Sequence, residues 1–409
     1  HDAVTESDQL QGTVRRPRDP AKHLSSGSAI VPSAPVTDVL LVALADVSRD
    51  ARTLNLARAL SAEGLRVTIM AAAASEDHQP PAVEGGAGID LIQWSDPGGR
   101  AARRWWSLRG YASRQSVRAR LVVAMDLFAL SAAAIIAQRS GARLVYDMRE
   151  LYFALGPLEG KGLKQRLLEM HERSMLRRVH RVIVSGELDA DLVQQRYGLT
   201  ERPFVLLNTP PYRDVVASDL RRRCGVSAGT PLAIYQGVVH HGRGLAPMFR
   251  AMALRPDLHL AIVGNGPAEA DLRGSAKAAG VSDRVHWLGS VPYDQLHALT
   301  CGADVGLCLI EPLSLSYEVA LPNKVFEYMM ARIPVLASDL PALRSLVEQH
   351  PIGPLVDRAL LPEDIDVALS QVFDPGLRAA MTDACEASRD LCYERQSQSS
   401  VQLIRDLLT

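Results

Sequence analysis

The sequence predicts an α/β protein made of two doubly wound, parallel-sheet domains, and two observations lead to this fold class. Short apolar segments alternate with amphipathic helical segments, which is typical of parallel sheets covered by helices on both faces. The pattern restarts after the tandem prolines of Asn208–Tyr212, where no regular element can continue. With 409 residues, the chain is long enough to form two separate hydrophobic cores.

The expected strands are short and rich in Val, Leu and Ile. Those of the first sheet are residues 39–44, 67–70, 121–124, 144–146 and 182–185, with helices such as 52–63 and 127–139 between them. Those of the second sheet are residues 232–235, 258–263, 285–288, 305–309 and 335–337. Ligands of such domains lie beyond the carboxyl ends of the strands, so we expect a cleft where the two domains face each other.

Segment boundaries follow from this pattern. Residues 1–35 contain Arg, Ser, Gly and Pro but no apolar segment of a signal peptide, and we expect a flexible tail there. We then expect a first Rossmann-like domain at 36–210, a second at 211–390 and a terminal helix at 391–409.

The composition argues against several partners. A net charge of −1 gives no electrostatic case for nucleic acid. The five cysteines are odd in number and lack zinc-ligand spacing, so we interpret them as reduced thiols of a cytoplasmic protein. No uninterrupted apolar run approaches the ~20 residues needed to cross a bilayer.

A segment near residue 320 has the layout of a nucleotide site. Ser314–Tyr317 and Pro322–Lys324 predict a loop and a turn, and Val325–Ala331 predicts a helix. The N–H groups at the start of that helix would bind an anion, and Lys324 adds a positive charge beside them. Glu327, one turn further in, is suited to the neutral diol of a ribose. Phosphate plus ribose indicates a nucleotide, and the alternative is an ordinary solvated helix start.

A glycine-bearing loop, Gly237–Gly244, lies between an expected strand and a helix expected from Leu245. Arg243 at the end of this loop can offer several hydrogen-bond donors to a diphosphate without a metal ion. The alternative is a plain strand-to-helix turn. Gly264 follows another apolar strand, where glycine is also common for turn geometry alone.

Several segments resemble motifs of the family 4 retaining glycosyltransferases, in the same order along the chain. The segment Pro322–Met329 is similar to the donor-site motif of that family, in its Pro-Asn-Lys-x-Phe-Glu-Tyr-Met variant. The other similar segments are 39–70, 144–152, 264–267 and 285–292. The resemblance covers the chain from roughly residue 38 to the C-terminus.

This resemblance implies the GT-B fold, in which an N-terminal acceptor domain faces a donor domain and the terminal helix crosses back to the first domain. It implies transfer of a sugar, with retention, from a UDP or GDP sugar to an unidentified hydroxyl acceptor that is lipid-linked, a polysaccharide or a natural product. No cofactor and no metal ion are implied. The donor-binding residues would be Gly237, Arg243, Gly264, Asn323, Lys324, Val325 and Glu327. The catalytic residues would be Arg243, Lys324 and Arg149.

Two positions depart from the family's pattern. Arg149 stands where the family carries a His beside the reacting sugar, and a guanidinium, with a pKa above ~12, cannot act as a base. Arg149 is open to two interpretations, a ligand contact or a structural ion pair with Asp147 or Glu150. Val319 stands where the family carries the first carboxylate of a Glu-x7-Glu pair, which leaves the donor sugar undetermined.

The expected acceptor-side residues are Asp126, Arg149 and Glu150. For Asp126, a structural role is the equal alternative. The stretch Arg100–Arg120 is rich in arginine and carries Trp105 and Trp106. We interpret it as a solvated basic face whose tryptophans pack on the first domain, and the alternative is peripheral contact with the inner face of a membrane or with a phosphorylated acceptor.

Two other functions remain open from the sequence. The same fold serves sugar epimerases and related coupling enzymes, and it also occurs in catalytically silent proteins that bind nucleotide sugars. Because of the departures at Arg149 and Val319, a catalytically silent protein remains an alternative. The sequence does not indicate the oligomeric state.

Overall fold

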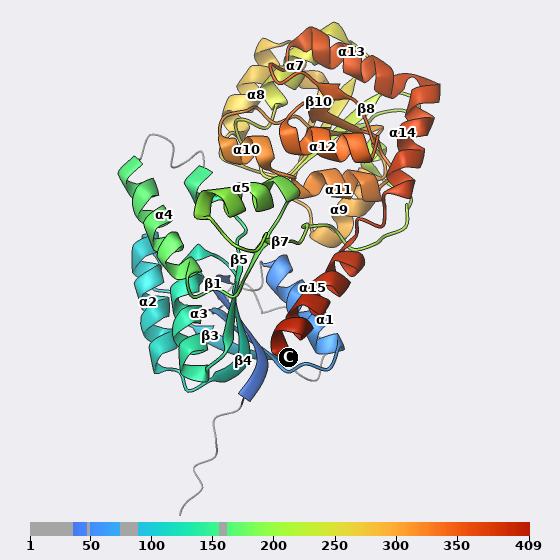
Figure 1. The fold of residues 1–409 in the computed structure, drawn as a ribbon. Helices are drawn as coiled ribbons and strands as arrows, with labels where there is room; N and C mark the ends of the chain where they lie inside the picture. Colours follow the sequence, from blue (N-terminus) through green and yellow to red (C-terminus); the bar gives the residue numbers. More distant parts are fainter. Residues whose placement is uncertain (1–35, 47–49, 74–88, 155–161) are drawn as a thin grey trace, which may run out of the picture. The chain divides into compact units, whose positions relative to one another are not determined.

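The computed structural model describes residues 36–46, 50–73, 89–154 and 162–409 (Figure 1). The expected flexible tail, residues 1–35, lies outside this range. The described chain contains two parallel β-sheets, each with helices packed on both faces. The predicted fold class, two doubly wound α/β domains, is therefore confirmed.

The first sheet has seven strands in the order β3-β2-β1-β4-β5-β6-β7, and every neighbouring pair is parallel. The order reverses between β1 and β4, and the carboxyl ends of strands at such a reversal form the usual ligand crevice. The elements are β1 (Val36–Asp46), α1 (Ala51–Ala62), β2 (Val67–Ala72), β3 (Ile89–Trp94), α2 (Ala101–Arg114), β4 (Arg118–Ala124), α3 (Leu127–Ser140), β5 (Arg143–Asp147), the 3-10 turn η2 (Tyr152–Ala154), α4 (Gly162–Leu176), β6 (Arg181–Val184), α5 (Glu187–Tyr197) and β7 (Phe204–Val205).

The second sheet has six strands in the order β10-β9-β8-β11-β12-β13, again all parallel, with the reversal between β8 and β11. Its elements are α6 (Leu220–Cys224), β8 (Leu232–Gln236), α7 (Leu245–Leu254), β9 (His259–Val263), α8 (Glu269–Ala278), η4 (Ser282–Arg284), β10 (Val285–Gly289), α9 (Tyr293–Thr300), β11 (Val305–Cys308), α10 (Leu315–Val319), α11 (Asn323–Met330), β12 (Val335–Ser338), α12 (Pro341–Gln349), β13 (Leu355–Val356), α13 (Pro362–Phe373) and α14 (Pro375–Ala387). The chain ends with α15 (Tyr393–Leu408).

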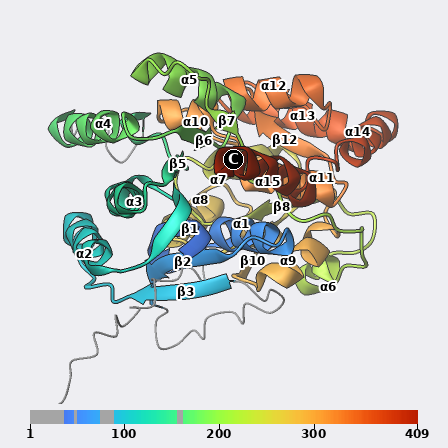
Figure 2. The same ribbon diagram turned by 60° about the horizontal axis from the view of Figure 1, so that its bottom comes forward.

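Alternating side chains of β1 divide the first domain into two cores. Leu40 and Val42 pack with α2 to α5 on one face of the sheet, while Val39 and Leu41 pack with α1 on the other. Helix α15 joins the second of these cores and lies beside α1 (Figure 2). The terminal helix thus fills the face of the first sheet that α1 alone leaves partly open.

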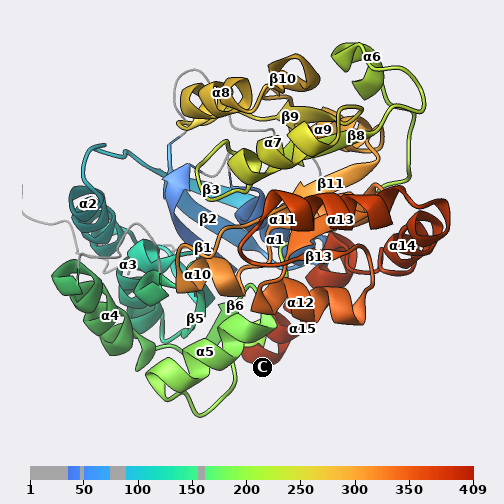
Figure 3. The ribbon, with the colours of Figure 1, turned by 90° about the horizontal axis from the view of Figure 1, so that it is seen from above.

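Strand β8 divides the second domain in the same way. Ala233 and Tyr235 pack with α7, α8 and α13, and Leu232 and Ile234 pack with α9, α11, α12 and α14. Figure 3 shows these helices around the strands of the second sheet. The strand is therefore buried on both faces, which accounts for its almost uninterrupted apolar sequence.

The structure corrects the expected elements at several points. Helix α10 occupies a segment predicted as a loop, because Val319 is buried against side chains of the first domain, and this packing outweighs weak helix propensity. Helix α11 begins at Asn323 rather than Val325, since polar residues are well tolerated in a first turn. Strand β3 was missed because it is a half-exposed edge strand, and β7 and β13 because each has two residues.

Two further observations concern the chain as a whole. None of the helices in the described part is long and apolar enough to cross a membrane. All five cysteines are free thiols, and four of them are buried.

Candidate active site

The junction of β8, β11 and the first turn of α11 brings most of the expected donor residues together. Gly237 follows β8 directly and has a φ of +120°, which glycine adopts without strain. A Cβ atom added to Gly237 would lie 3.8 Å from Nζ of Lys324. The ammonium group of Lys324 therefore lies against the backbone of the glycine loop.

Lys324 is partly buried rather than held out in a solvated turn. Its Nζ lies 3.8 Å from the centre of the Tyr235 ring, and the Tyr235 hydroxyl donates a 2.7 Å hydrogen bond to the carbonyl of Val238. One buried ring thus supports both the cation and the loop. Burial lowers the pKa of Lys324 to about 8, and the charge of Arg243 acts in the same direction, while Cys308 and Glu327 oppose it.

Arg243 is the second cation of this junction. Its guanidinium carbon lies 4.9 Å from the centre of the Tyr317 ring, so Arg243, like Lys324, makes a cation–π contact with a tyrosine. Because the two cations repel each other in a partly desolvated place, an anion of charge −2 would relieve that repulsion. The expectation that Arg243 and Lys324 act together is compatible with this geometry and stays a prediction.

Glu327 lies one turn further along α11, next to the end of β8. Burial raises its pKa, while a hydrogen bond from the Gln236 amide and the charges of Lys324 and Arg213 oppose the rise. The sequence reasoning missed Gln236, although a signal was present. It is a polar residue at the carboxyl end of an otherwise apolar strand, which is the edge where ligands bind.

The remaining donor candidates lie around this junction in different ways. A Cβ atom on Gly264 would lie 1.9 Å from the carbonyl oxygen of Gly237, so the two loops touch through their backbones. Gly264 therefore has a packing role, and a donor contact by it stays a prediction. Asn323 is exposed at the start of α11. Val325 is buried, and its N–H donates to the carbonyl of Pro322 at 3.1 Å.

In the first domain, Arg149 is held by side chains of its own domain. Its guanidinium donates to Asp50 at 2.7 Å and to the Thr53 hydroxyl at 2.8 Å, and it lies 3.4 Å from Asp147. Asp147 also accepts two hydrogen bonds from one edge of the Arg52 guanidinium, from Nη2 at 2.7 Å and from Nε at 2.8 Å. Of the two ion-pair partners considered from the sequence, the structure has Asp147, and it adds Asp50.

The network also fixes the start of α1. Asp50 caps this helix by accepting from the backbone N–H of Thr53 at 3.1 Å. Burial alone would raise the pKa of Asp50, but Arg149 and Thr53 outweigh it and hold this pKa below its ordinary value. Arg149 thus has a clear structural role, and its catalytic assignment stays a prediction.

The two expected acidic residues of the acceptor side lie close to this network. Asp126 caps α3 by accepting from the N–H of Ala129 at 2.7 Å, and burial raises its pKa. Burial also raises the pKa of Glu150, while the positive charge of Arg243 opposes this rise. Glu150 of the first domain and Arg243 of the second therefore influence each other. The sequence reasoning missed Asp189 on α5, whose pKa burial raises to about 7 with a contribution from Glu150.

The structure also explains the second departure. Val319 is buried among apolar side chains of the first domain, so an apolar residue suits this position. Its neighbour Glu318 accepts a hydrogen bond from Arg358 at 2.7 Å. Glu318 is thus paired with a residue outside the donor junction.

The basic stretch forms helix α2 and the strand after it. Trp105 packs edge-on against His171 of α4, with ring centres 5.3 Å apart, as the structural interpretation expects. Trp106 lies edge-on to Trp105, with ring centres 4.5 Å apart, but it is 61% exposed, and Arg109 lies over its ring. Helix α4 adds three exposed apolar side chains at helical spacing, namely Leu163, Leu167 and Met170.

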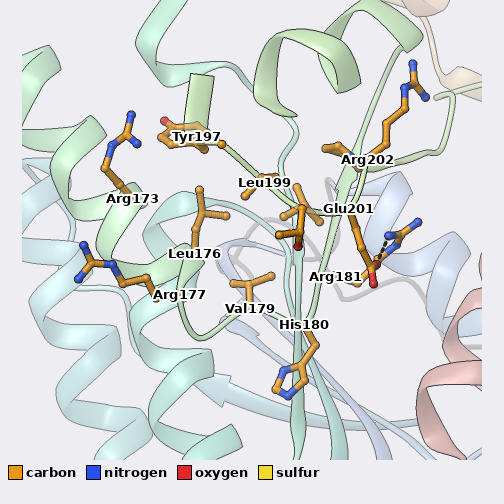
Figure 4. Close-up of a pocket in the computed structure, with 14 residues that line it drawn as sticks. Arg173, Leu176, Arg177, Val179, His180, Arg181, Tyr197, Leu199, Glu201 and Arg202 are labelled. Atoms are coloured by element: carbon orange, nitrogen blue, oxygen red, sulfur yellow. Dashed lines mark hydrogen bonds and ion pairs between the residues drawn. The ribbon is translucent and has the colours of Figure 1, made fainter. Parts of the chain in front are cut away.

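The surface cavity in Figure 4, about 430 Å³ in volume, lies elsewhere. It is lined by residues around the start of β6 and the end of α5, among them His180 and the ion pair of Arg181 with Glu201. This cavity therefore lies at the amino ends of the strands. Asp126 and Arg149 lie at the opposite edge of the sheet, beyond the carboxyl ends of the strands. None of the expected site residues lines it, and we therefore do not assign the reaction to this cavity.

No metal centre was found within the described residues, where His, Cys, Asp and Glu do not form a group of three suited to a metal ion. The charged groups described on the donor side are Lys324, Arg243, Arg213 and Glu327.

Comparison with known families gives two matches. The model described as a glycosyl transferase 4-like domain matches residues 50–210, and the model of glycosyl transferases group 1 matches residues 217–384. A 2-deoxystreptamine N-acetyl-D-glucosaminyltransferase of Streptomyces fradiae is 29% identical over 258 residues, which are 60% of this chain and 55% of the relative. The chain thus spans about half the length of this curated relative.

Solved structures agree with the fold. Sucrose-phosphate synthase of Thermosynechococcus elongatus superposes with a TM-score of 0.72 at 18% identity, over 91% of this chain and 99% of the other. The Anabaena protein HepE, solved in complex with UDP and glucose, gives a TM-score of 0.67 at 18% identity, over 90% and 99%. At such identities the likeness concerns the fold, and it confirms the predicted GT-B architecture.

The low pKa of Lys324 can be tested without any ligand. After reductive methylation with ¹³C-formaldehyde, one lysine signal should titrate near pH 8 in NMR spectra, because burial and Arg243 disfavour the charged form. The variant Lys324→Arg identifies this signal by removing it. Arg243→Ala should raise the pKa of Lys324 and Glu327→Gln should lower it further. A Lys324 signal that titrates only above pH 10 would contradict the buried environment described here.

The structural role of Arg149 can be tested by unfolding in urea. Arg149→Ala should lower the free energy of unfolding by about 2–4 kcal/mol, because it leaves the buried carboxylate of Asp50 without its ion-pair partner and Asp147 with Arg52 alone. Arg120→Ala is a suitable control, since it breaks an exposed pair with Asp38 and should cost about 1 kcal/mol or less. Equal losses in the two variants would show that Arg149 adds no more stability than a surface residue.

Proposed function

We propose that the chain is a group 1 glycosyltransferase that transfers a sugar from a nucleoside diphosphate sugar to a hydroxyl acceptor with retention of configuration. The matches of residues 50–210 to the glycosyl transferase 4-like model and of residues 217–384 to the group 1 model support this proposal. The observation that supports this activity best is the placement of Lys324 and Arg243. The two cations influence each other beside the glycine loop, and Glu327 lies one helical turn from Lys324.

The proposed mechanism uses this charge arrangement. As the bond between the sugar and the diphosphate breaks, negative charge grows on the leaving oxygen, and Arg243 and Lys324 would stabilise it. The start of α11 would add N–H donors on the same side. No metal ion is needed in this scheme, because the two side chains supply the positive charge.

The acceptor hydroxyl would attack on the face that the diphosphate leaves. Its proton would pass to the leaving phosphate oxygen, since Arg149 cannot accept a proton at neutral pH. In this proposal Arg149 acts through its contacts with Asp50 and Asp147, which shape the acceptor side. Asp126 and Glu150 would contact the acceptor.

The comparisons suggest where to begin the search for substrates. HepE was solved with UDP and glucose, so UDP sugars come before GDP sugars in a screen. The relative from Streptomyces fradiae is named for 2-deoxystreptamine, which favours a natural-product acceptor over a polysaccharide or a lipid-linked sugar. A cytoplasmic location, expected from the reduced cysteines, stays a prediction.

The activity can be tested by incubating the protein with UDP and GDP sugars and a panel of aminocyclitol and sugar acceptors. We expect release of the nucleoside diphosphate together with a glycoside whose anomeric configuration, read by NMR, equals that of the donor. Arg243→Ala should reduce turnover by about 10²–10³-fold and donor affinity much less, because the leaving-group charge grows in the transition state. Arg250→Ala, an exposed arginine of α7, is the matched control.

Other outcomes would favour the alternative functions. Donor binding without turnover over the whole acceptor panel would favour a catalytically silent protein. Conversion of the donor sugar without release of nucleoside diphosphate would favour an epimerase. A loss of donor affinity in Arg243→Ala with unchanged turnover would contradict the role given to this residue.

A peripheral membrane contact is a second proposal, and the exposed side chains of α2 and α4 support it. Trp106, Leu163, Leu167 and Met170 are 53–76% exposed, and the last three lie on one face of α4 at intervals of four and three residues. Arginines flank them on both helices, and α4 adds Lys164. Exposed apolar groups beside cations suit the surface of an anionic bilayer.

Vesicle sedimentation tests this contact. The protein should bind vesicles of phosphatidylglycerol and phosphatidylcholine but not vesicles of phosphatidylcholine alone, and added salt should weaken the binding. Changing Leu163, Leu167 and Met170 to Ser should abolish it. Changing Leu254 and Leu377, which are about half exposed on the second domain, is the control and should have no effect. Equal binding by both sets of variants would contradict the proposed surface.

A further inference from the structure

We propose that Gln236, supported by Thr300, is a positioning residue for Glu327, which it holds as an ionised acceptor turned towards the ribose of the donor. This inference rests on the proposed function, because it concerns how the same donor site distinguishes a ribose. Neither residue belongs to a motif that the sequence analysis singled out. Both are among the few fully buried polar residues of the described chain, each being 1% exposed.

The contacts form a short chain of hydrogen bonds. The Gln236 side-chain amide donates to Oε2 of Glu327. Its oxygen, Oε1, lies 2.8 Å from the hydroxyl of Thr300, and the same hydroxyl lies 2.8 Å from the carbonyl of Leu296. The hydroxyl of Tyr328 lies 3.3 Å from the backbone nitrogen of Gln236, which also ties the backbone of this residue to α11.

The burial of Gln236 decides what it can do. A side chain that is 1% exposed cannot offer its amide to a ligand, so its effect on the donor must pass through Glu327. A cavity lined by Glu327, Gln236 and Thr300, among other residues, has a volume of only about 20 Å³, which is room for about one water molecule. The Gln236 amide is therefore the main hydrogen-bond donor that the protein offers to this carboxylate.

The orientation of the amide is coupled to the protonation of Glu327. When Glu327 is ionised, the amide NH₂ faces it and the Thr300 hydroxyl donates to Oε1. When Glu327 is protonated, the amide can turn over, accept from the carboxyl group and donate to Thr300, whose hydroxyl then donates to Leu296. Both arrangements satisfy every buried group, but only the first leaves Glu327 as a pure acceptor for the two hydroxyl groups of a ribose.

This coupling explains why a buried carboxyl group can serve a diol. Burial raises the pKa of Glu327, and the hydrogen bond from Gln236 acts against that rise. Without the amide, a larger fraction of Glu327 would be protonated at low pH, and a protonated group accepts less strongly. Recognition of the ribose should then depend on pH more strongly than in the natural protein.

The test compares two ligands that differ only in the ribose hydroxyls. Isothermal titration calorimetry gives the affinities of UDP and of 2′,3′-dideoxy-UDP, or of the GDP pair if GDP binds better, between pH 6 and pH 8. Their ratio isolates the ribose, because effects of Lys324 on the diphosphate cancel. Two charge-assisted hydrogen bonds imply that the natural protein prefers the ribose form by at least about tenfold.

The variants separate positioning from general damage. Gln236→Met keeps the size of the side chain and should remove most of this preference, more at pH 6 than at pH 8. Thr300→Val should lower the preference and Thr300→Ser, which keeps the hydroxyl, should restore it. Ile234→Val deletes one methylene group on the same strand and should leave the ratio unchanged. If Gln236→Met does not fold, the two Thr300 variants carry the comparison.

The outcomes distinguish the two proposals. If the natural protein binds neither UDP nor GDP, the proposed function is wrong and the inference fails with it. If the natural protein prefers the ribose form and Gln236→Met or Thr300→Val keeps the same ratio at both pH values, the positioning role is wrong while the proposed function stands.

Discussion

The donor side of the molecule depends on one constraint, which is that the positive charges of Lys324 and Arg243 lie close together in a partly desolvated site. Lys324 lies against the backbone of Gly237 and over the ring of Tyr235, and Arg243 lies close enough to lower the pKa of Lys324. Like charges in such a place repel each other unless an anion joins them. The fold holds them there because β8, its loop and the start of α11 are fixed by packing on both faces of the sheet.

Two glycines of the second domain lie where the loops next to these cations meet. The loop after β8 touches the loop after β9, and the carbonyl of Gly237 leaves no room for a Cβ atom at Gly264. The same holds at Gly266, where a Cβ atom would lie 2.1 Å from the carbonyl of Val239. These glycines therefore shape the donor side through backbone contact, whatever their own distance from a ligand.

The sequence predicted the fold, and it singled out Lys324, Arg243 and Glu327, because both results depend on local patterns. Apolar strands alternate with helices, and Lys324 and Glu327 occur in a compact motif. It could not predict partners that are distant in sequence, such as Thr300 for Gln236 or Asp50 for Arg149, since hydrogen bonds over 64 and 99 residues leave no local signal. Helix α10 was missed for a related reason, because Val319 packs on residues of the other domain.

Arg149 shows how such a distant contact changes the interpretation of a single residue. In the sequence Arg149 occupies the position where the family carries a histidine. The loss of a possible catalytic base at this position favours a catalytically silent protein. In the structure its guanidinium joins Asp50, Asp147 and Thr53, so the position has gained a structural role rather than only lost a chemical one. If the acceptor's proton leaves with the diphosphate, no base is required at this position. The departure at Arg149 is then compatible with transfer, provided that Arg243 and Lys324 carry the charge of the leaving group.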